Sequence, residues 1–195
     1  RGREVIESML GKKFKGVLVS DCLNIYDDVN EVQQKCYSHH LKAISQALER
    51  KEGQDQSYLL ALKGILKAAM ALKKAEMEEE ELKNRRQQLE KNTERLLAKN
   101  REDPTEESVR QRLWKQRDHL FTFLDYEQVE ATNNLAERQL RPAVITRKVS
   151  CGNRTESGAR TWQILASLAA SCQQRGESFL DLIQANMPLA ASDSR

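Results

Sequence analysis

The first apolar positions of the chain predict a helix and then a strand. Over residues 3–10 the apolar spacing is helical, and Gly11 ends the run. Residues 17–19 form a short continuous apolar run with β-branched side chains, typical of a strand buried between parallel neighbours. We therefore expect Asp21 just beyond the carboxyl end of a strand, where ligands and metals bind in open α/β sheets.

Three shorter elements follow before the middle of the chain. Residues 24–31 indicate a short helix or turn, residues 33–37 a second short strand, and residues 39–50 a helix that is closed by Gly53. These patterns predict that residues 1–44 form the strand-bearing part of the molecule.

A long run of helix-forming residues occupies the middle of the chain. Residues 56–101 contain no proline and a single glycine, and strong helix formers dominate them. Apolar residues recur every seven positions in this run: Ala68, Ala75, Leu82, Leu89 and Leu96. The companion positions become polar in the second half, which is too polar for a free coiled coil. We expect one long helical arm that packs as a hairpin against a helix over 105–124, capped by Thr105, so that residues 45–125 form an all-helical insertion.

The last third of the chain predicts helices with one extended piece. The expected elements are a helix from Asn134, an extended piece at 144–146 after Pro142, a helix over 155–174 and a last amphipathic turn or two over 179–183. We expect residues 126–187 to form one region and the small, polar residues 188–195 to form a flexible tail.

Composition adds little to this pattern. A chain of 195 residues, 39% hydrophobic and 31% charged, can bury a core and expose much helix surface. The net charge of +3 permits nucleic-acid binding without arguing for it. The four cysteines form no CxxC pair, which favours a reduced, cytoplasmic setting, and no apolar run is long enough for a membrane helix.

Two carboxylates each allow two interpretations. Asn134 to Glu137 fits a capping box, in which Glu137 reaches back to a free amide at the helix start. Glu137 also suits a metal-binding carboxylate of a nuclease-like site, with Asp21 as its distant partner. Asp21 in turn suits an ordinary turn or helix cap after a strand.

Basic side chains surround Glu137 in the sequence. Arg138 and Arg141 are three apart and share a helix face, while Arg147, Lys148 and Arg154 lie around a predicted turn. As a group they suit a DNA phosphate backbone, and singly each is ordinary solvated surface.

Cys36 and His39 have the spacing of a zinc-ligand pair, but the chain offers no second pair of ligands. The simpler interpretation is that both side chains pack against the end of the second strand.

Three segments resemble bacterial DDE transposases of the insertion-sequence-sixty-six family. The first is Gly16 to Asp21 with Tyr26 five residues on, which resembles the strand of the second catalytic aspartate. The second is Cys36-Tyr37-Ser38-His39, similar to the Cys-x-x-His element of the family. The third is Asn133-Asn134-Leu135-Ala136-Glu137-Arg138, continued by Leu140-Arg141-Pro142 and Arg147-Lys148, and it resembles the glutamate motif.

The resemblance implies an α/β, ribonuclease-H-like core, mostly helical in this chain, and cleavage and joining of DNA strands. It implies that Asp21 and Glu137 bind Mg²⁺, with Mn²⁺ as a substitute, and that Asn133 and Asn134 are structural. DNA-binding roles fall to the basic residues named above, and we expect a homo-oligomer in the bacterial cytoplasm at the nucleoid.

The resemblance places the first catalytic aspartate on a strand before the helix at 3–10. We therefore expect the chain to be the central and C-terminal part of a catalytic domain, inactive alone. The alternative is a non-catalytic DNA-binding or dimerisation module derived from a transposase.

Overall fold

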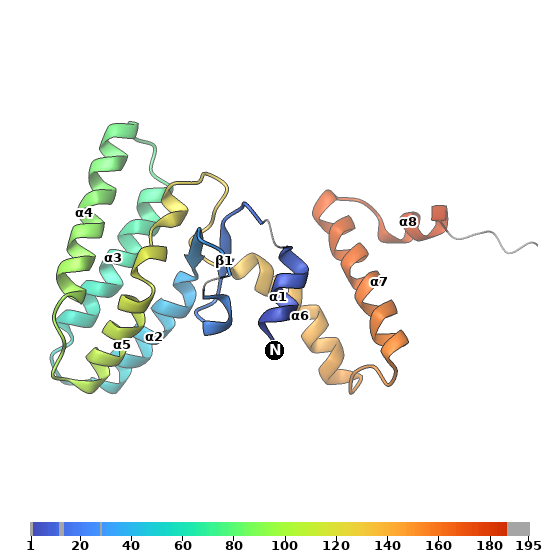
Figure 1. Ribbon diagram of the computed structural model, residues 1–195, viewed down its shortest axis with the longest axis horizontal. Coiled ribbons are helices and arrows are strands. Elements are labelled where there is room, and N and C mark those ends of the chain that lie inside the picture. Colours follow the sequence, from blue (N-terminus) through green and yellow to red (C-terminus); the bar gives the residue numbers. More distant parts are fainter. Residues whose placement is uncertain (1, 12–13, 28, 187–195) are drawn as a thin grey trace, which may run out of the picture. The chain divides into compact units, whose positions relative to one another are not determined.

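The computed structural model describes residues 2–11, 14–27 and 29–186 (Figure 1). The chain divides into two compact units, one reaching to Asn134 and one starting at Leu135. The predicted tail at 188–195 lies outside the described residues. In the part that the structure describes, none of the helices is long and apolar enough to cross a membrane.

The first unit opens with a helix and a small sheet, as expected. Helix α1 (Arg3–Leu10) ends at Gly11, whose φ of 73° is readily adopted by glycine. Strand β1 (Leu18–Ser20) pairs in parallel with β2 (Gln33–Lys35), and the 3₁₀ turn η1 (Asn24–Tyr26) lies in the connection between them. The parallel pairing confirms the prediction for the first strand.

Strand β2 is polar in sequence and fully buried in the structure. Its burial is possible because its side chains find partners. The Gln34 amide accepts a hydrogen bond from Phe123 N (2.9 Å) and donates to the Leu120 carbonyl (3.2 Å). Lys35 reaches the Asp27 carboxylate at 3.2 Å. These partners allow the second strand, expected over residues 33–37, to be buried although its side chains are polar.

Four helices form a bundle beside this sheet, running side by side in Figure 1. They are α2 (Tyr37–Arg50), α3 (Ser57–Lys73), α4 (Glu79–Leu97) and α5 (Pro104–Lys115). Their buried apolar side chains share one core: Ile44, Ala47, Leu59, Leu62, Leu66, Ala69, Leu97, Val109 and Leu113. Tyr37 and Phe123 extend this core with a T-shaped ring contact of 5.2 Å between centroids.

The prediction of a single long helix over residues 56–101 is wrong. The chain turns between α3 and α4, and the two helices pack against each other. Burial explains the turn, because a reversal lets the apolar face of α3 meet α4 inside the bundle, which outweighs continuous helix propensity. The buried positions of α3 also differ from the sevenfold repeat, since Ala68 and Ala75 are exposed whereas Leu66 and Ala69 are buried.

The helix expected over 105–124 is shorter than predicted. Helix α5 ends at Lys115, and the 3₁₀ turns η2 (Arg117–His119) and η3 (Thr122–Leu124) follow it. Its cap is Asp103, whose side chain accepts the amides of Thr105 and Glu106, and Thr105 is not the cap. Pro104 occupies the first helical position, where its missing N–H costs nothing.

The remaining helices are α6 (Asn134–Val149), α7 (Glu156–Arg175) and α8 (Phe179–Asn186). The prediction of an extended piece at 144–146 is wrong, because α6 continues through Pro142 to Val149. No residue of α6 is buried, so water can satisfy the carbonyl that proline leaves without a donor. Helix α7 matches its prediction, with Thr155 accepting the Gly158 amide and Gly176 ending the helix at φ 69°.

Candidate functional site

Asp21 lies at the carboxyl edge of the β1–β2 pair, as predicted. The Ser20 carbonyl accepts the Cys36 amide at 2.9 Å, so the segments that leave the two strands are adjacent. Asp21 is half-buried, and its Oδ1 accepts the Leu23 amide at 3.2 Å. This hydrogen bond confirms the turn interpretation of Asp21. Its Oδ2 accepts no hydrogen bond within the described part of the chain, which leaves an oxygen suited to a hard cation.

The Cys36–His39 segment is hydrogen-bonded to the residues that precede Glu137. Tyr37 N donates to the Ala131 carbonyl (2.9 Å), the buried Cys36 Sγ accepts the Asn133 amide (3.1 Å), and Ser38 Oγ donates to Asn134 Oδ1 (3.0 Å). Segments 96 to 97 residues apart thus meet at the carboxyl edge of the sheet. The contacts of Cys36 agree with a packing role for this segment.

Glu137 occupies the first turn of α6, where a carboxylate interacts favourably with the helix dipole. Its side chain is exposed. Asn134 is itself within the helix, and its side-chain oxygen accepts the Ser38 hydroxyl. Asp21 belongs to the first compact unit and Glu137 to the second, so their sharing of a metal ion stays a prediction.

The predicted DNA-binding residues are exposed. Arg138, Arg141 and Lys148 lie on α6 at spacings that place them within one face of the helix, over about 15 Å of its length. Arg147 lies outside this face, and Arg154 follows the turn after the helix.

A network of charges around the loop after β1 was not predicted. Asp27 accepts Lys35 Nζ at Oδ1 (3.2 Å) and Lys115 Nζ at Oδ2 (2.8 Å). Lys35 is fully buried, whereas Lys115 is half-exposed at the end of α5. Burial opposes the ionisation of Asp27, but the hydrogen bonds from Lys115 and Lys35 outweigh it, and the pKa of Asp27 is lowered. No local sequence motif predicts this network, because its members come from three separate elements.

A thiol and an imidazole meet beside the same loop. Cys22 Sγ and His40 Nε2 are 3.4 Å apart, and the Arg112 guanidinium lies near the Cys22 side chain. Burial raises the pKa of Cys22 despite the nearby Arg112 guanidinium. Burial, with the charge of Arg112, lowers the pKa of His40 to about 3. Both groups are therefore neutral near pH 7, which is unlike an activated Cys–His nucleophile.

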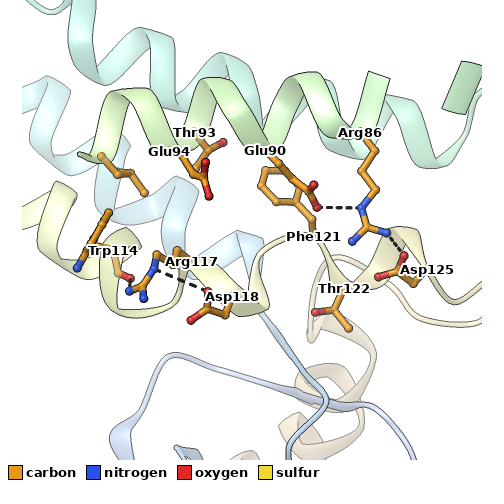
Figure 2. Close-up of a pocket in the computed structure, with 11 residues that line it drawn as sticks. Arg86, Glu90, Thr93, Glu94, Trp114, Arg117, Asp118, Phe121, Thr122 and Asp125 are labelled. Atoms are coloured by element: carbon orange, nitrogen blue, oxygen red, sulfur yellow. Dashed lines mark hydrogen bonds and ion pairs between the residues drawn. The ribbon is translucent and has the colours of Figure 1, made fainter. Parts of the chain in front are cut away.

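A hollow of about 290 Å³ lies elsewhere in the first unit, between α4 and the segment of η2 and η3 (Figure 2). Arg86 crosses it to pair with Asp125 and also binds Glu90 at 2.9 Å. Arg117 stacks on the Trp114 ring at 4.5 Å from its centroid. Because carboxylates line much of this hollow, it does not suit a DNA phosphate.

Comparisons with known proteins agree with the sequence motifs. The protein y4qI of Sinorhizobium fredii (strain NBRC 101917 / NGR234), described as uncharacterized, is 39% identical over 77 residues. That alignment covers 40% of this chain and 14% of the relative. No solved structure matches the chain. Residues 1–161 match the family described as "Transposase IS66 family", which is the insertion-sequence-sixty-six family. The chain therefore belongs to the IS66 family of transposases.

Proposed function

We propose that the chain is the central and C-terminal part of a DDE transposase catalytic domain with a ribonuclease-H-like core. Family membership supports a transposase-related role. The observation that carries the proposal is the meeting of segments at the carboxyl edge of the β1–β2 pair. Asp21 leaves β1 at this edge, and the residues just before Glu137 are hydrogen-bonded there to Cys36 and Ser38.

In this proposal Asp21 and Glu137 supply carboxylate oxygens to divalent ions, together with a third aspartate on a strand that precedes α1. Mg²⁺ suits such a site because it takes oxygen ligands and keeps places for water and phosphate. When bound, paired ions activate the attacking oxygen and stabilise the leaving oxygen at a phosphodiester. Mn²⁺ has the same ligand preference and is expected to substitute.

The DNA partner is assigned to the exposed basic residues. Arg138, Arg141 and Lys148 would follow one strand along α6, and Arg147 and Arg154 would contact phosphates beyond it. Such contacts position the DNA and make binding weaker as the salt concentration rises.

The test uses a full-length transposase that contains this chain and the first aspartate. Asp21→Asn and Glu137→Gln should each lower Mg²⁺-dependent cleavage of the element's ends by about 10³-fold or more, because each removes a charged ligand. The dissociation constant for DNA should change little in both variants. Glu127→Gln, at an exposed carboxylate in the loop before α6, is the matched control. Cleavage that persists in both site variants would refute the assignment.

The alternative, a non-catalytic DNA-binding or dimerisation module, draws on one observation. Large apolar side chains are exposed on α6 and α7, among them Val149, Ile164 and Leu165. The arm is a weaker candidate for dimerisation, since α3 buries Leu62 and Leu66 inside its own bundle. Sedimentation of the chain distinguishes dimerisation through α6 and α7 from dimerisation through α3. A dimer that persists when Leu60, an exposed residue of α3, becomes Glu but dissociates when Ile164 becomes Glu would favour this alternative.

A further inference from the structure

The loop that starts at Asp21 is fixed mainly from outside. Within the loop, the Leu23 amide donates to Asp21 Oδ1 at 3.2 Å, and the η1 turn follows directly. Strand β1 is only three residues long, so the sheet alone provides a short base for the loop. The remaining polar contacts of the loop come from β2, from helix α5 and from His40 of α2, whose Nε2 lies 3.4 Å from Cys22 Sγ.

Helix α5 presents two cations to this loop. Lys115 Nζ lies 2.8 Å from Asn24 Oδ1 and 2.8 Å from Asp27 Oδ2. Arg112, one turn earlier on the same face, places its guanidinium charge near the Cys22 side chain. Lys115 therefore holds the loop at Asn24 and Asp27, after Leu23, and the charge of Arg112 lies near its beginning at Cys22.

The opposite side of α5 is fixed to the bundle. Glu106 is buried and accepts Lys51 Nζ at 2.6 Å, and Arg110 donates to the Leu97 carbonyl at 2.9 Å. Val109 and Leu113 lie in the shared core. Because α5 is packed this firmly, a residue at its end can hold the loop against a rigid support.

We propose that the helical insertion positions the candidate metal ligand Asp21, with Lys115 as the positioning residue. The insertion thereby acts as a brace for the loop between β1 and η1. The inference rests on the proposed function only for what Asp21 does, since the hydrogen bonds that form the brace do not depend on metal binding.

The first measurement is independent of activity. Lys115→Met removes both hydrogen bonds and keeps a side chain of similar length. The exchange rate of the Leu23 amide, followed by NMR, should rise about fivefold because the loop opens more often. Amides of α3 and α4 should keep their protection, since Lys115 is half-exposed and outside the core. Lys115→Arg should restore most of the protection of Leu23.

The matched control is Lys91→Met, at an exposed lysine of α4 that makes no hydrogen bond or ion pair within the described ranges. Asn24→Ala, which removes one of the two acceptors of Lys115, should give a smaller rise in Leu23 exchange than Lys115→Met. Equal Leu23 exchange in Lys115→Met and Lys91→Met would overturn the brace.

The second measurement addresses the link to catalysis, in the full-length transposase. Lys115→Met should lower kcat for Mg²⁺-dependent cleavage and leave KM for DNA unchanged, and Lys115→Arg should recover kcat. A rise in KM at constant kcat would instead assign Lys115 to DNA binding and overturn the positioning role. If Leu23 exchange responds as expected but the unaltered protein cleaves no DNA, the proposed function fails and the brace remains.

Discussion

His40 shows how a single buried group responds to its surroundings. Its side chain is fully buried between Cys22, which it contacts, and the positive charges of Arg112 and Lys35. Both burial and these charges disfavour the imidazolium, and His39 beside it adds to the effect. The pKa of His40 is therefore lowered to about 3, and the folded protein holds the ring neutral.

This state of His40 predicts a dependence of stability on pH. The unfolded chain protonates this histidine near pH 6.5, whereas the folded chain does so only near pH 3. The contribution of neutral His40 to stability is thus fully present above pH 6.5, and it is lost as the pH falls toward 3. Between pH 7 and pH 5 the free energy of unfolding should fall by about 2 kcal/mol from this group. Urea unfolding at the two pH values measures it.

His40→Gln is the variant that isolates this contribution, because its amide does not titrate. Its stability at pH 7 can be lower than that of the unaltered chain, but the fall between pH 7 and pH 5 should be smaller by about the same 2 kcal/mol. An equal fall in both proteins would show that His40 is protonated as easily in the folded chain as in the unfolded one.

At the level of elements, local patterns identified most helices and strands but not all their boundaries. Strand β1, its parallel pairing and α7 were predictable because apolar runs and caps are local signals, whereas β2 is polar in sequence. The turn between α3 and α4 was missed because it contains neither Pro nor Gly. A signal was present: Lys73 ends α3 and Glu79–Glu81 open α4, the charge order that helix dipoles favour at two helix ends.

In the candidate site, too, the residues marked by local patterns were found and those that depend on contacts between elements were missed. Asp21 was found because it follows a strand, and the residues before Glu137 because they match a motif. Lys35, Arg112 and Lys115 were missed because their roles arise only when β2 and α5 meet the loop after β1. Contacts between elements that are distant in the sequence produce no periodic pattern of residues, so a sequence pattern cannot predict them.

Pro142 gives a prediction at the element scale. Within α6 it removes one backbone donor and crowds the preceding turn, which costs about 3 kcal/mol in a helix interior. Pro142→Ala should therefore slow amide exchange over residues 143–149 by about tenfold or more and strengthen the helical circular dichroism signal. The matched control is Pro104→Ala, since Pro104 sits at the start of α5 and should give no such gain. Equal exchange before and after Pro142→Ala would mean that α6 is not continuous.

At the scale of the whole molecule, the two units differ in how they are held together. The first unit has a shared apolar core and a charged network at one end of its bundle. In that network Glu106 accepts Lys51 at 2.6 Å and Arg101 at 2.9 Å, and Asp103 also pairs with Lys51 at 2.9 Å. Of the helices in the second unit, α8 has no buried residue and α7 buries Cys172. The stability of the first unit should thus depend on its core and network independently of α7 and α8.

Glu106→Gln tests this separation. The change keeps the size of the side chain but removes the charge that two cations share, so the first unit should lose about 2 kcal/mol of stability. Glu81→Gln is the control, because its ion pair with Arg85 is exposed on α4 and contributes little. Hydrogen exchange followed along the chain gives the decisive result: in Glu106→Gln the amides of α2 to α5 should exchange faster, while those of α7 keep their rates. If α7 loses protection in step with α2, the two units unfold as one, and the division at residues 134 and 135 is not a boundary of stability.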